Sequence, residues 1–143
     1  MNFDNYTIKT QEALQQAQQI AQSYGHQQIE NEHLFKAIYE VDQNVLPFLF
    51  KKLNLNTGLL LQILEKELES FSKVSGGDIM LSRSAMKSLN EAAIIAKKSG
   101  GEFVATEDLL LAIFNSKSKV SQILKDQGVT EKDLKASIAS LRK

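Results

Sequence analysis

Two pairs of polar side chains are the residues best placed to do chemistry. Thr7 and Ser82 each lie just before a predicted helix. Glu32 and Glu107 each lie in the first turn of the next predicted helix along the chain. A carboxylate can bind a guanidinium group, so each hydroxyl and its carboxylate predict a polar site. The same residues also suit helix caps and the first helical turn. Both interpretations stay open, because a cap can also border a binding surface.

Catalytic and metal-binding arrangements are not evident. The glycine-containing segments 75–78 and 99–102 lack the lysine of a phosphate-binding loop. His26 and His33 are seven residues apart, which is not a zinc-ligand spacing, so we expect surface or capping roles for them. The sequence has no cysteine and hence no thiol nucleophile. We therefore expect a binding module with no catalytic residues, metal or cofactor.

The elements that position these residues come from a duplication. A shift of 75 residues aligns the two halves of the sequence. The aligned identical pairs are Leu14 with Leu89, Ala17 with Ala92, Ile20 with Ile95, Ala21 with Ala96, Gly25 with Gly100, Glu32 with Glu107, Leu34 with Leu109, Ala37 with Ala112 and Ile38 with Ile113. Because the matches keep their order, the chain is predicted to hold two copies of one motif.

Apolar residues recur at helical spacing throughout both copies, which predicts an all-α fold of eight helices in two four-helix repeats related by a pseudo-twofold axis. Gly25 and Gly100 end the first helix of each copy. The later helices are predicted near 31–41, 45–53 and 56–71, and near 106–114, 118–127 and 130–142. No segment alternates convincingly with period two, so we expect no strand. The repeats span 1–72 and 82–143, with 73–81 as a linker.

Charge is balanced overall but not between the copies. The 17 basic and 17 acidic residues cancel, which gives no reason to expect nucleic acid or a membrane as partner. Residues 1–72 hold five basic and nine acidic residues, and 73–143 hold twelve and eight, so the copies carry net charges of −4 and +4. Either the copies attract each other weakly or a dipolar surface orients a partner. No leader or membrane span is evident, so we expect a cytoplasmic protein.

Three apolar residues lie outside the apolar stripes of their predicted helices: Leu59, Leu61 and Ile94. We expect them to be buried between the copies. The alternative is a groove that accepts exposed hydrophobic segments.

A family resemblance rests on three segments. TIKTQEALQQAQ at 7–18, HQQIENEHL at 26–34 and GGEFVATEDLLLA at 100–112 resemble the Clp N-terminal repeat. GGD at 76–78 resembles the ClpB branch of the Hsp100 disaggregases more than the protease-linked ClpA and ClpC branches.

The resemblance implies an N-domain joined flexibly to a hexameric ring of ATPase modules, which this sequence does not contain. Such domains engage unfolded or aggregated polypeptides, and in the protease-linked branch they bind adaptors or arginine-phosphorylated substrates. The substrate-binding residues that the resemblance implies are Thr7, Glu32, Ser82 and Glu107. We predict Leu89 and Asp108 as further substrate-binding residues, although Asp108 departs from the family pattern.

Three hypotheses follow. The first is a ClpB-like substrate-recognition domain that binds exposed hydrophobic or basic segments weakly. The acidic residues expected there would favour clients that carry lysine or arginine; they are Glu32, Glu91, Glu107 and Asp108. The second is a ClpC-like or ClpA-like module that docks an adaptor or phospho-arginine at the two hydroxyl–carboxylate pairs. The third is a structural cap that biases the ATPase ring without contacting substrate.

Overall fold

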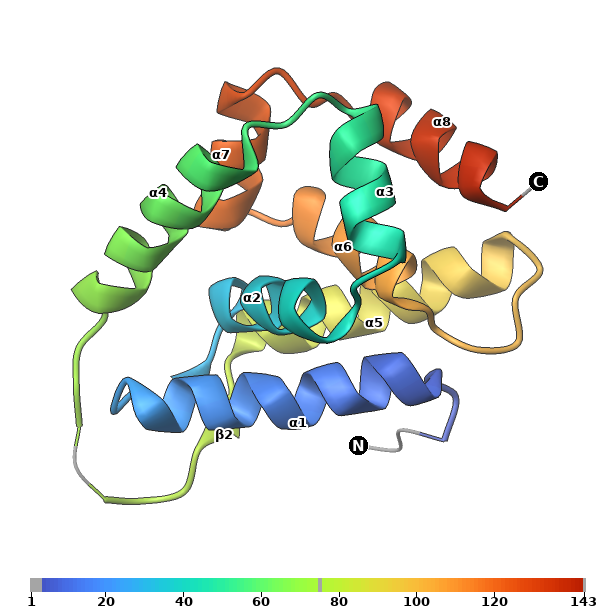
Figure 1. Cartoon of the computed structure of the whole chain (residues 1–143). Helices are drawn as coiled ribbons and strands as arrows, with labels where there is room; N and C mark the ends of the chain where they lie inside the picture. Colours follow the sequence, from blue (N-terminus) through green and yellow to red (C-terminus); the bar gives the residue numbers. More distant parts are fainter. Residues whose placement is uncertain (1–3, 75, 143) are drawn as a thin grey trace.

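The computed structural model describes residues 4–74 and 76–142, and the fold of this part of the chain is all-α, as predicted. Eight α-helices are present in it (Figure 1). They are α1 (Ile8–Ser23), α2 (Asn31–Val41), α3 (Val45–Lys52), α4 (Thr57–Ser70), α5 (Arg83–Lys98), α6 (Thr106–Phe114), α7 (Lys119–Asp126) and α8 (Glu131–Leu141). None of these helices is long and apolar enough to cross a membrane.

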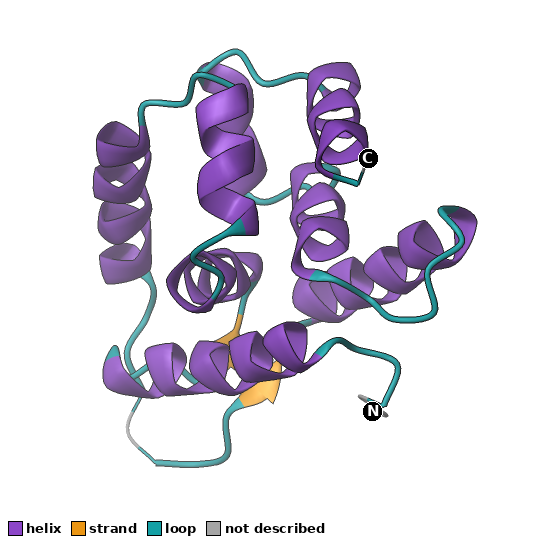
Figure 2. Ribbon diagram, turned by 45° about the vertical axis from the view of Figure 1, so that its right-hand side comes forward, coloured by secondary structure: helices purple, strands orange, loops and turns teal. Residues whose placement is uncertain are grey.

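Two very short strands correct the expectation that the chain has none. β1 (Gln28–Ile29) and β2 (Met80–Leu81) pair in parallel, and Tyr6 forms an isolated parallel bridge with Val104. Strands of two residues are too short to show a period-two pattern. β2 also gives structure to the end of the segment predicted as a linker (Figure 2).

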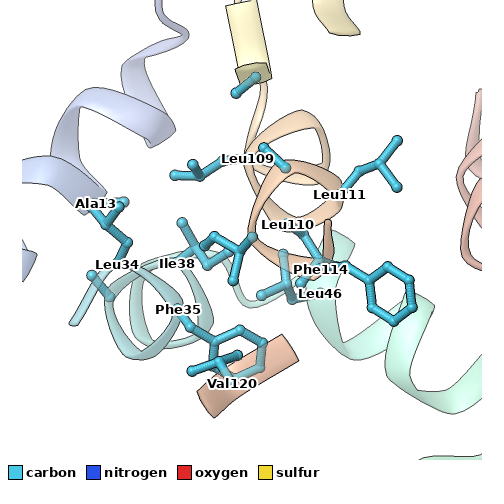
Figure 3. Close-up of a cluster of buried hydrophobic side chains, with 14 of the residues drawn as sticks. Ala13, Leu34, Phe35, Ile38, Leu46, Leu109, Leu110, Leu111, Phe114 and Val120 are labelled. Carbon is cyan, nitrogen blue, oxygen red and sulfur yellow. The ribbon is translucent and has the colours of Figure 1, made fainter. Parts of the chain in front are cut away.

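The core is centred on α2 and α6. Phe35 and Ile38 from α2 meet Leu109 and Leu110 from α6, and Leu46 from α3 packs against them (Figure 3). All five side chains are at most 1% exposed. Burial of such side chains contributes about 1.5–3 kcal/mol each, so this junction is a major source of stability.

The third and fourth helices of each copy pack across to the other copy. α3 packs on α8, and α4 packs on α7, so the third helix of each copy contacts the fourth helix of the other. α1 lies against α2, and α5 against α6, on the opposite side of the centre (Figures 1 and 2). This reciprocal packing agrees with a pseudo-twofold relation and gives the two copies one continuous core.

Asp42 ties three helices together at one buried point. Its Oδ1 accepts hydrogen bonds from the backbone N–H groups of Asn44 and Val45, which start α3, and its Oδ2 accepts one from the Thr106 hydroxyl, which starts α6. Asp42 itself follows the last residue of α2. The carboxylate therefore links the end of α2 to the beginnings of α3 and α6.

Candidate binding surface

Thr7 and Ser82 are N-caps, as one of the two interpretations predicted. The Thr7 hydroxyl accepts a hydrogen bond from the backbone N–H of Thr10 at 3.1 Å, and the Ser82 hydroxyl accepts one from that of Ala85 at 3.0 Å. Each satisfies one of the free donors in the first turn of its helix.

The predicted pairing of each hydroxyl with the carboxylate of its own copy was wrong. The Thr7 N–H donates to the carbonyl of Val104, just before α6, and the Ser82 N–H donates to that of Ile29, just before α2. Thr7 and Glu32 instead lie at opposite ends of α1, a helix of 16 residues and therefore about 24 Å long. The chain crosses between the copies, so Thr7 faces the segment that leads to Glu107.

Glu32 caps a helix of the other copy. Its side chain is buried, and its Oε2 accepts hydrogen bonds from the backbone N–H groups of Lys119 and Val120 at 3.1 and 3.4 Å. These donors open α7, where a negative charge also interacts favourably with the helix dipole. Burial nevertheless raises the pKa of Glu32. Glu32 thus holds α2 against α7.

Glu107 and Asp108 hold a guanidinium group that belongs to the chain itself. Arg142 Nε lies 3.2 Å from Glu107 Oε2, and its Nη2 lies 2.9 Å from Asp108 Oδ1. The other oxygen of Asp108 accepts a hydrogen bond from the Ala105 N–H at 2.9 Å and so caps α6. Arg142 Nη1 also donates to the Ser99 hydroxyl at 3.1 Å. The two carboxylates are therefore already engaged.

Replacing Arg142 by glutamine is expected to lower the free energy of unfolding by about 1–2 kcal/mol. The substitution leaves the buried Asp108 carboxylate without its ionic partner, and an unpaired buried charge is destabilising. Urea unfolding measures the change. Lys132→Gln, a change at an exposed residue of α8, is the control and should move stability by less than about 0.5 kcal/mol.

Leu89 provides no accessible surface. Its side chain is 0% exposed and belongs to the core. Of the six residues predicted to bind substrate, only Glu107 and Asp108 are brought together by a shared partner. Glu32 and Ser82 are largely buried as well. The structure therefore distributes these residues over several helix junctions.

The apolar residues outside the stripes are less buried than expected. Leu59 and Ile94 are 44% and 47% exposed, so the prediction that they lie buried between the copies was wrong for both. Leu61 is only partly buried, against the core, so it meets the prediction in part. Periodicity places a residue on a helix face, but it does not show whether a neighbouring helix covers that face.

An apolar groove does lie nearby, between α5, α6 and α8. Its volume is about 600 Å³. Ile95, Leu111 and Ile138 provide its apolar lining together with Ala139, which is exposed. The charged residues around it are Glu91, Lys98, Asp108, Glu131, Lys135 and Arg142. Ser99 and Asn115 complete the lining, and we refer to this groove as the client groove.

The equivalent place in the first copy is filled by polar side chains. Lys36 takes the position of Leu111, and Glu65 takes that of Ala139. Lys36 Nζ lies 3.7 Å from Glu65 Oε2, and the Tyr24 hydroxyl donates to the same carboxylate at 2.6 Å. Only about 310 Å³ of space remains there. The alignment of the copies thus contained evidence for a groove in one copy only.

His26 and His33 contact each other inside the protein. His26 Nδ1 and His33 Nε2 are 2.8 Å apart, and His33 Nδ1 accepts a hydrogen bond from the Glu30 N–H at the start of α2. The capping role was right for His33, whereas the surface role was wrong because both rings are buried. In residues 4–74 and 76–142, no three potential ligands are grouped to hold a metal ion.

Known proteins resemble this chain along nearly all of its length. Residues 5–127 match the family model described as the Clp repeat (R) N-terminal domain. The chaperone protein ClpB of Bacteroides thetaiotaomicron is 46% identical over 143 residues, which are 100% of this chain but 17% of that protein. The chain therefore spans about a sixth of this relative.

Solved structures show the same fold. The N-terminal domain of Hsp104 from Candida albicans superposes with a TM-score of 0.85 at 20% identity, covering 97% of this chain and 92% of that one. The N-domain of ClpV in complex with a VipB peptide superposes with a TM-score of 0.79 at 15% identity, covering 96% and 86%.

Proposed function

Because the chain belongs to the family of Clp repeat N-terminal domains, we propose that it recognises unfolded or aggregated polypeptide for a ClpB-like AAA+ chaperone. The client groove carries this proposal. It has an apolar lining, lies open at the surface and has a volume in the range of ligand-binding pockets. Apolar side chains of an unfolded segment fit such a lining, whereas folded proteins bury most of their large apolar side chains.

The charges around the client groove do not favour basic clients. Three acidic and three basic residues line it, and two pairs among them, Asp108 with Arg142 and Glu131 with Lys135, are already ion pairs. This balance removes the reason to expect a preference for lysine or arginine. We expect weak binding, in the micromolar to millimolar range, which corresponds to roughly 4–8 kcal/mol.

The relatives support a role within a longer chain. This sequence spans 17% of the ClpB relative, so a hexameric ring of ATPase modules as the partner of this domain is part of the proposal. A ClpV N-domain has been solved with a peptide, which supports peptide binding as a use of this fold. We propose that the domain acts in the cytoplasm and performs no catalysis itself.

The alternative of adaptor or phospho-arginine docking requires free carboxylates. Glu32 is bonded to the start of α7, and Glu107 and Asp108 are bonded to Arg142. A ligand guanidinium would first have to displace Arg142. The client groove needs no such displacement, which is why we favour it.

Ala139→Glu is expected to weaken binding of a short unfolded peptide rich in leucine and phenylalanine by at least about tenfold, equivalent to about 1.4 kcal/mol. The new carboxylate would stand in the client groove, as Glu65 does at the equivalent place of the first copy. Chemical-shift titration by NMR measures the affinity. Because Ala139 is exposed, the fold should be retained.

Ala136→Glu is the matched control. Ala136 is also exposed, is on the same helix and does not line the client groove. Equal affinity of the two variants, or peptide-induced shifts away from Ile95, Leu111 and Ile138, would contradict the proposal.

A further inference from the structure

A second hollow continues the client groove toward the start of α5. It lies between α5 and the end of α6 and has a volume of about 430 Å³. It shares Glu91 and Asn115 with the client groove. Its other lining residues are Arg83, Ser84, Lys87, Ser88, Ala112, Ser116 and Lys117. We call this hollow the basic pocket.

The charge of the basic pocket is strongly one-sided. Arg83, Lys87 and Lys117 are cationic and exposed, and Glu91 is its one acidic lining residue. Among the residues that the structure describes, none of the three cations forms an ion pair within 4.0 Å. Three positive charges and one negative charge leave a net charge of +2 around the pocket. An anion with a charge near −2 would balance it.

Ser88 leaves a buried hydroxyl unsatisfied in this pocket. The residue is 2% exposed, and in the described part of the chain its Oγ has no hydrogen-bond partner. A buried polar group without a partner is destabilising by about 1–3 kcal/mol, so its presence asks for an explanation. The neighbouring Ser84 hydroxyl accepts a hydrogen bond from Asn31 Nδ2, so its own hydrogen remains available to an acceptor. Both hydroxyls can donate to an anion in the pocket.

The first copy shows that packing does not require these residues. The position of Ser88 is taken there by Ala13, which is equally buried. Arg83, Lys87 and Lys117 correspond to Ile8, Glu12 and Asp42. The same helical framework therefore forms without the cations and without the hydroxyl, and the net positive charge belongs to this pocket specifically.

We propose that the basic pocket binds a phosphate monoester carried by a side chain of the client polypeptide. A phosphoserine side chain carries a charge of about −1.5 to −2 and three strong acceptor oxygens. These match the net charge of the pocket and its cationic and hydroxyl donors. Apolar residues next to the phosphoserine would extend into the client groove, through the shared residues Glu91 and Asn115. The identity of the carrier rests on the proposed function, whereas the anion site stands on the pocket alone.

The test compares two forms of one unfolded peptide, with phosphoserine or serine beside its leucines. NMR titration should show the phosphopeptide binding about tenfold more tightly, with shifts at Ser84, Ser88 and Asn115. Arg83→Gln with Lys87→Gln should remove this preference, because two of the three cations are lost. Ser88→Ala should weaken phosphopeptide binding severalfold without lowering the melting temperature, since it also removes an unsatisfied hydroxyl.

Lys97→Gln is the matched control, because Lys97 is an exposed cation of α5 that does not line the pocket. It should leave the preference intact. Equal affinity for the two peptides, or an equal loss in Lys97→Gln, would overturn the proposal. Inorganic phosphate that binds as tightly as the phosphopeptide would show a site for the free ion instead, and a tighter-binding oligonucleotide would show a nucleic-acid site.

If the client groove does not bind polypeptide, the titrations give a different result from the one that would overturn the anion site. The serine peptide would then not bind, while inorganic phosphate and the phosphopeptide would still shift the resonances of Ser84 and Ser88.

Discussion

Asp42→Ala is expected to lower the free energy of unfolding by about 3 kcal/mol. The substitution removes an acceptor that serves the backbone N–H groups of Asn44 and Val45 and the hydroxyl of Thr106. Because Asp42 is 5% exposed, water cannot easily replace it. A lost N-cap is destabilising by about 0.5–2 kcal/mol, and donors left buried without a partner add about 1–3 kcal/mol. Urea denaturation followed by circular dichroism measures the change.

A double-mutant cycle separates the two functions of this carboxylate. Thr106→Val should be destabilising in the wild-type background and much less so in Asp42→Ala, because its partner is then already absent. Asp126→Ala is the control. That aspartate is exposed and pairs with Gln122 on its own helix, so its loss should change stability by less than about 0.5 kcal/mol. Equal losses at Asp42 and Asp126 would show that the buried junction contributes nothing.

The helices were predictable because their causes are local. The stripe of Leu14, Ala17 and Ile20 on α1 is a helical period, and Gly25 ends the helix with a φ of +74°, a conformation that glycine adopts without strain. The same reasoning applied to the second copy, where Gly100 has a φ of +82°. Every predicted helix was found, with boundaries within about two residues of the expected ones.

The contacts between elements were not predictable in the same way. Thr7 meets Val104, and Ser82 meets Ile29, because the backbone crosses between the copies. Periodicity identifies the buried face of a helix but does not name the element that covers it. Pairing each hydroxyl with the nearest carboxylate of its own copy was therefore a guess about topology, and it failed.

The candidate sites differed from one another in how far the sequence could reveal them. The acid positions of Glu32 and Glu107 followed from the helix starts, but the partners of these residues, the start of α7 and Arg142, lie about 87 and 35 residues away. The client groove could have been predicted from the sequence, because the alignment of the copies places Leu111 opposite Lys36 and Ala139 opposite Glu65. The basic pocket could have been predicted in the same way, from Ala13 and Ser88.

Acidification is expected to destabilise the domain through His26 and His33. The Glu30 N–H donates to His33 Nδ1, so the neutral ring of His33 carries its hydrogen on Nε2 and donates it to His26 Nδ1. A second proton on His33 would point at the Glu30 N–H, and one on His26 Nδ1 would point at His33. Burial lowers the pKa of both rings, that of His33 to about 4. Both histidines are therefore neutral in the folded protein near pH 7.

The direction of the effect follows from the protons bound. In the unfolded chain His33 titrates near its ordinary pKa of 6.5, and in the folded protein near 4. Between these values the unfolded chain binds more protons, so stability is complete above about pH 6.5 and falls as the pH drops toward 4. For a fully buried ring the loss from His33 is about 3 kcal/mol. Below about pH 4 this histidine causes no further loss.

Protonation of Glu32 affects stability in the opposite direction, so its contribution must be separated from that of His33. Burial raises its pKa in the folded protein, so the folded state binds the proton more tightly, and acidification through that range favours folding. Glu32→Gln removes this contribution. In that background, denaturation from pH 7 to pH 4 should show a steep loss of stability, and adding His33→Gln should flatten it. A slope unchanged by His33→Gln would show that His33 is not the group responsible for the loss.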